Sequence, residues 1–110
     1  MTKAYRKGQV FIQGRLAAAL IETEEGYAFQ YIHDYLASEK PLAASLTLPL
    51  QREPYHSTIL FPFFDGLIPE GWLLDITSTH WKLDRKDRFG LLLAISDETV
   101  GDIGIQEVSQ

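Results

Sequence analysis

The sequence predicts an α+β domain in which a small antiparallel sheet carries helices packed on one side. Three observations predict this class. The first third of the chain holds short β-prone runs between turns, the second half holds apolar residues at helical spacing, and a β-prone run returns at residues 103–108. Strands grouped together and followed by helices are typical of α+β domains, whereas strict alternation indicates a parallel sheet.

Three strands are expected first, at residues 9–13, 16–22 and 27–31. Residues 23–26, with a glycine at the end, form the turn before the third strand. Alternate residues of a strand point to the same face, so one face of the third strand carries three aromatic rings and belongs to the core. These are Tyr27, Phe29 and Tyr31.

The middle of the chain is expected to contain one helical turn at residues 34–38 and a strand at residues 42–50, where apolar residues recur in strict period two. Pro49 makes that strand an edge or a strand end. Residues 51–56 are then a loop, Ser57 can cap a helix, and residues 61–67 form a short helix that closes near Pro69.

Two further helices are predicted. Residues 73–81 place apolar side chains at helical spacing, and residues 85–95 form a strongly apolar helix. Asp84 can cap the second of these helices, with Asp87 in its first turn near the positive end of the helix dipole.

Composition limits the possible functions. The 110 residues with 45% hydrophobic content fit one domain, residues 1–110. The absence of cysteine excludes a disulfide scaffold, and no N-terminal apolar run resembles a signal peptide, so a cytoplasmic protein is expected. No apolar run approaches the roughly 20 residues that cross a bilayer. A net charge of −5 disfavours direct nucleic-acid binding.

Residues that could carry chemistry are sparse. The three histidines, His33, His56 and His80, lack metal-site spacing, and no cofactor motif is present. An acid and base pair drawn from three nearby carboxylates remains a minor alternative. These carboxylates are Asp65, Glu70 and Asp75.

The most informative segment is residues 61–72, in which aromatic residues precede a Pro-Glu-Gly turn. Pro69 and Gly71 turn the chain sharply, which favours presentation of Trp72 from a rigid loop as the anchor of a protein interface. The alternative is that Trp72 covers the core beside Phe63 and Phe64. The predicted partner-binding residues are Trp72, Gly71, Glu70, Asp65, Pro69 and Leu73.

These blocks, taken in order, resemble the N-terminal subdomain of HipA-type toxin kinases. The resemblance rests on residues 10–14, 27–31 and 41–50, on Phe-Phe-Asp-Gly-Leu-Ile-Pro-Glu-Gly at 63–71, and on Asp-Arg-Phe-Gly-Leu-Leu at 87–92. It covers nearly the whole chain, and the block at 63–71 is its most specific part. The sequence departs from the family at Trp72-Leu73-Leu74, where HipA kinases commonly continue with polar or basic residues.

The resemblance implies a function. In HipA kinases a catalytic core with the ATP and magnesium ligands follows this subdomain, and 110 residues leave no room for one, so the chain is not expected to be an enzyme. A stand-alone subdomain looks like HipS, the antitoxin of three-gene HipBST modules, which would bind and inhibit a HipT-like serine/threonine kinase in a complex that includes the DNA-binding HipB. A structural or activating subunit of a split kinase is the alternative. A small independent enzyme is the third reading.

Overall fold

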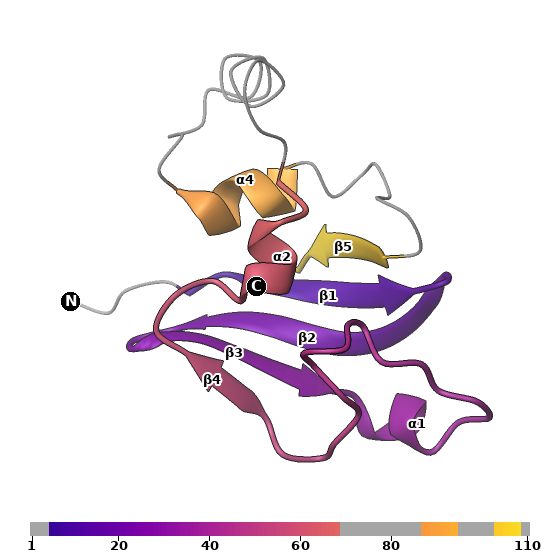
Figure 1. Ribbon diagram of the computed structural model, residues 1–110. Coiled ribbons are helices and arrows are strands. Elements are labelled where there is room, and N and C mark those ends of the chain that lie inside the picture. The colour runs from indigo at the N-terminus through magenta and orange to yellow at the C-terminus, as the bar shows by residue number, and fades with distance from the viewer. Residues whose placement is uncertain (1–4, 69–86, 95–102, 109–110) are drawn as a thin grey trace.

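The computed structural model describes residues 5–68, 87–94 and 103–108 (Figure 1). Five strands form one antiparallel sheet in the order β4-β3-β2-β1-β5, so the last strand pairs with the first. The elements are β1 (Lys7–Ile12), β2 (Arg15–Thr23), β3 (Gly26–Tyr31), α1 (His33–Leu36), β4 (Tyr55–Ser57), α2 (Pro62–Asp65), α4 (Arg88–Ala94) and β5 (Ile103–Glu107).

The strand register gathers the apolar side chains on one face of the sheet. Val10 of β1 lies opposite Ala18 of β2 and Ile105 of β5, and Leu20 of β2 lies opposite Phe29 of β3. All five are buried. The neighbouring residues along these strands point to the other face of the sheet. There Gln9 pairs with Gln106, and Ala19 pairs with Gln30. Such alternation is typical of an antiparallel sheet with one packed face.

The helices cover the packed face. Figure 1 shows α2 and α4 on the same side of the sheet. Phe64 of α2 lies 5.3 Å from Phe29 between ring centroids, and Phe89 of α4 lies 5.6 Å from Tyr27. The stacked rings of Tyr31 and Tyr35 join α1 to the same face. The predicted fold class, an antiparallel sheet with helices on one side, is therefore confirmed.

Most predicted elements within the described residues are present, with small shifts of their ends. The strands expected at 9–13, 16–22, 27–31 and 103–108 are β1, β2, β3 and β5, and the helical segments expected at 34–38 and 61–67 are α1 and α2. Tyr27, Phe29 and Tyr31 all pack on the core, although Tyr27 is only partly buried. The helix predicted at 73–81 and the cap Asp84 lie outside the described residues.

The strand predicted at 42–50 is wrong. This segment is a loop with one isolated bridge, between Ser45 and Leu48. Pro41 and Pro49 cannot donate a backbone hydrogen bond, and Lys40 has a left-handed φ of 52°, which turns the chain. The period-two pattern does not separate inside from outside, because Leu42 and Leu46 are exposed whereas Ala44 and Leu48 are buried.

The predictions around Ser57 are also wrong. Residues 55–57, expected to lie in a loop and a cap, form β4 against β3. The Ser57 hydroxyl accepts a hydrogen bond from the Ile59 amide at 3.3 Å, and no side chain caps α2, which begins with Pro62. Proline at the first helical position supplies a preset φ in place of a polar cap.

The helix predicted at residues 85–95 is α4 within the described residues, but Asp87, predicted in its first turn, precedes the helix and caps it. Its Oδ1 accepts a hydrogen bond from the Gly90 amide at 3.1 Å, and its carbonyl accepts one from Leu91. These two bonds are those of an N-cap residue.

No helix among the described residues has the length and apolar character needed to cross a membrane.

Candidate functional site

Helix α2 packs the phenylalanines at the start of the 61–72 segment against the core. Phe64 is fully buried and Phe61 nearly so, whereas Phe63 is half-buried. The ring centroid of Phe64 lies 5.1 Å from that of Phe63 and 6.5 Å from that of Phe61, and both pairs are edge-to-face. Aromatic pairs of this kind add to the free energy gained by burial. Phe61, Phe63 and Phe64 therefore fix α2 to the core, and residues 69–73 follow α2 in the sequence.

Asp65, the last residue of α2, forms an ion pair with α4. Its carboxylate Oδ1 lies 2.6 Å from Nε of Arg88 at the start of α4, and the Arg88 guanidinium also donates to the Asp65 carbonyl at 3.4 Å. The two helices that flank residues 66–87 in sequence are thus joined directly. Asp65 was predicted to meet basic groups of a partner, and here a cation of the same chain already occupies its carboxylate.

A second charged cluster joins α4 to the sheet. The Arg6 guanidinium donates to Glu22 at 2.9 Å and to Asp87 at 2.7 Å and 3.0 Å, and it lies 5.3 Å from the centroid of the Phe89 ring. These hydrogen bonds raise the pKa of Arg6, and those from Arg6 lower the pKa of Asp87. The cluster fixes the start of α4 to the sheet where β1 begins and β2 ends, and it was not predicted from the sequence.

The remaining predicted site residues lie outside the described residues. They are Pro69, Glu70, Gly71, Trp72 and Leu73. The structure thus locates one of the six predicted partner-binding residues, Asp65, and it places that residue at the junction of α2 and α4.

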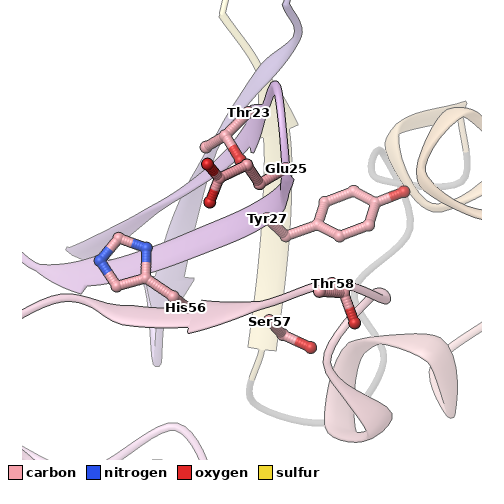
Figure 2. Close-up of a pocket in the computed structure, with 6 residues that line it drawn as sticks. All are labelled: Thr23, Glu25, Tyr27, His56, Ser57 and Thr58. Carbon is pink, nitrogen blue, oxygen red and sulfur yellow. The ribbon is translucent and has the colours of Figure 1, made fainter.

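A polar pocket of about 230 Å³ lies where the β2–β3 turn meets β4 (Figure 2). Figure 2 shows the Tyr27 ring and the His56 imidazole pointing away from each other. Tyr27 lies opposite Ser57 in the register, so the neighbouring His56 points to the other face of the sheet. Burial raises the pKa of Tyr27 above its ordinary value. These groups do not converge on a common point.

The described histidines do not form a metal site. His33 begins α1 and His56 lies in β4, and both side chains are exposed. Within residues 5–68, 87–94 and 103–108, no group of three or more histidines and carboxylates is close enough to hold a metal ion. His80 and Asp75 lie outside these ranges.

The fold and its sequence blocks match a known family. The description of the matching family is "HipA N-terminal domain", and the match runs over residues 8–106. The chain belongs to the HipA N-terminal domain family.

Two further comparisons show which proteins the chain is similar to. An uncharacterized protein of Haemophilus influenzae is 36% identical over 110 residues, which is 100% of both proteins. Among solved structures, the N-terminal domain of HipA toxin superposes with a TM-score of 0.69 at 27% identity, covering 100% of this chain and 99% of that one. The Asp65–Arg88 ion pair joins the most specific block of the HipA-like sequence, 63–71, to the block at 87–92.

Proposed function

We propose that this chain is a protein-binding module that holds a separately encoded HipT-like serine/threonine kinase inactive, as an antitoxin does, and that it has no kinase activity of its own. The match to the N-terminal domain of HipA toxin over the full chain carries this proposal. A domain that accompanies a kinase in one protein has the surface needed to bind a kinase supplied separately. The Haemophilus influenzae relative, aligned over its whole length, supports a protein built from this domain.

The arrangement around α2 supports an inhibitory contact near residues 69–73. The core anchors α2 through Phe64, and the Asp65–Arg88 ion pair fixes its end against α4. A segment that starts from a fixed base loses less entropy on docking than one on a mobile arm. Trp72, presented after Pro69 and Gly71, is the proposed anchor at the kinase cleft, where it prevents closure of the active site.

A structural or activating subunit of a split kinase is the second candidate function, because it uses the same contact. Growth of cells that express the kinase separates the two. Co-expression of this chain restores growth if it is an antitoxin and deepens the growth defect if it activates the kinase. We also propose a ternary complex with a HipB-like DNA-binding protein, in which the DNA contacts come from HipB.

Substitution of each tryptophan sharpens the growth assay. Trp72→Ala is expected to change the melting temperature by no more than a few degrees and to abolish rescue of growth, with a loss of at least about 2 kcal/mol of binding free energy. Trp81→Ala is the matched control, since Trp81 is predicted on the apolar side of a helix and its loss should cost roughly 3 to 5 kcal/mol of stability. Full rescue by a stable Trp72→Ala protein would move the inhibitory contact elsewhere.

A further inference from the structure

The loop at residues 42–49, shown in Figure 1 within the long magenta connection between α1 and β4, is held by the hydroxyls of Tyr31 and Tyr35. The Tyr35 hydroxyl lies 2.8 Å from both the amide nitrogen and the carbonyl oxygen of Leu42. Tyr31 accepts from the Ala44 amide at 2.9 Å and donates to the Leu48 carbonyl. Because these partners belong to β3 and α1, the loop backbone is fixed to the folded core.

This fixed loop displays leucine side chains to water. Leu46 is 100% exposed and Leu42 is 45% exposed. Leu46 contributes nothing to the core, yet the turn around it is closed by hydrogen bonds from Thr47 to Ser45 and from Leu48 to Ser45. Loops are normally the mobile part of a domain, and binding residues are often placed on loops that a rigid scaffold positions.

The loop has the composition of an interface centre. Residues 41–51 contain no charged side chain, whereas 23% of the residues in the whole chain are charged. The segment therefore differs in charge from the rest of the chain. Charged and exposed residues stand on both sides of it: Glu39, Lys40, Arg52 and Glu53. An uncharged, apolar centre with a polar rim is the usual anatomy of a protein–protein interface.

One of the loop's two exposed leucines, Leu42, also lies next to α2 and the residues that follow it. Leu42 lines an apolar pocket of about 300 Å³ together with Phe63 and Leu67, and the remaining described lining is apolar apart from Gln13. Phe63 and Leu67 lead directly in sequence to the segment proposed to contact the kinase. The loop is therefore joined through this pocket to Leu67, which lies two residues before the proposed inhibitory segment in the sequence.

We propose that the tyrosine-held loop is a second contact for the HipT-like kinase, with Leu46 inserting into an apolar pocket of the kinase and Leu42 covering its rim. This inference rests on the proposed function and adds a surface to it. The partner surface is apolar and uncharged, because the loop carries no charge and presents Leu46 fully exposed. Prior fixation by Tyr31 and Tyr35 removes much of the entropy cost of ordering a loop on binding.

The test measures the affinity of purified HipT-like kinase for four versions of the full chain: the parent, Leu46→Asp, Ile59→Asp and Tyr35→Phe. Leu46→Asp should weaken binding at least about tenfold with an unchanged melting temperature, because its side chain touches only water in the free protein. Ile59, which is 66% exposed and lies outside the loop, is the matched control and should bind as the parent does. Tyr35→Phe should weaken binding while the domain stays folded, since the hydroxyl bonds to Leu42 are lost.

Each other result overturns the inference. If the parent binds and Leu46→Asp binds equally well, the loop is not a contact while the proposed function stands. Equal weakening by Leu46→Asp and Ile59→Asp indicates a general effect of added negative charge. A parent that does not bind the kinase removes the proposed function together with this inference. Self-association lost in Leu46→Asp, with kinase binding retained, assigns the loop to contact between copies of this chain.

Discussion

Arg6 is the residue that most tightly couples distant parts of the chain. Its guanidinium bonds Glu22, 16 residues away, and Asp87, 81 residues away. Only 13% of the Glu22 side chain is exposed, so removal of Arg6 would leave a largely buried carboxylate without this cation. Contacts over such separations leave no periodic signal in the sequence, which is why this cluster was not predicted while the nearby apolar helix was.

The Arg6–Asp87 pair predicts a dependence of stability on pH. The folded pKa of Asp87 lies below its ordinary value, so the pair's contribution is complete above about pH 5 and is lost as the pH falls through the lowered folded pKa. Asp87→Asn keeps an oxygen for the Gly90 amide but removes the charge. Its cost in urea denaturation should be about 1 kcal/mol at pH 7, and it should disappear in strong acid.

A double-mutant cycle provides the control for this prediction. In an Arg6→Ala background the cost of Asp87→Asn at pH 7 should shrink, because the pairing cation is gone. An equal cost at pH 7 and in strong acid would show that the charge of Asp87 does not contribute to stability.

At the scale of elements, local signals predicted the hairpin strands, α1, α2 and β5. They failed where tertiary contacts decide the backbone. The alternating leucines of residues 42–50 predicted a strand, but tyrosine hydroxyls satisfy the Leu42 and Ala44 amides and hold the segment as a loop. The short strand β4 has no pattern of its own, because it owes its extended form to pairing with β3. Of the predicted site, only the Asp65 ion pair lies within the described residues.

The approach of β4 to the β2–β3 turn predicts the effect of two glycine substitutions. Gly26 has a φ of 148°, and an added Cβ would lie 2.2 Å from the Ser57 carbonyl oxygen. Gly14 also has a positive φ, 79°, but no heavy atom lies within 4 Å of the Cβ position. Both substitutions to alanine carry backbone strain, whereas only Gly26→Ala also displaces β4.

Gly26→Ala should therefore cost roughly 2 to 3 kcal/mol of unfolding free energy and Gly14→Ala about 1 kcal/mol. Chemical denaturation measures both, and amide exchange in β3 and β4 should rise only for Gly26→Ala. Equal costs for the two variants would contradict the close approach of Ser57 to this turn.

At the scale of the whole molecule, α1, α2, α4 and the 42–49 loop pack on one face of a five-stranded sheet. Leu42 of the loop and Phe63 of α2 contribute apolar surface to one pocket. Leu67, which also lines this pocket, precedes in the sequence the segment that distinguishes the chain from HipA kinases, Trp72-Leu73-Leu74. Family membership and this surface together favour a module that acts through binding.

The central claim is that this chain restrains a kinase in trans. The most direct measurement follows phosphate transfer by a purified HipT-like kinase while this chain is added in increasing amounts. The proposed function predicts that activity falls toward zero as binding saturates, and that the chain alone with ATP and magnesium transfers no phosphate. Kinase activity that is unchanged or increased at saturating, demonstrated binding would contradict the claim.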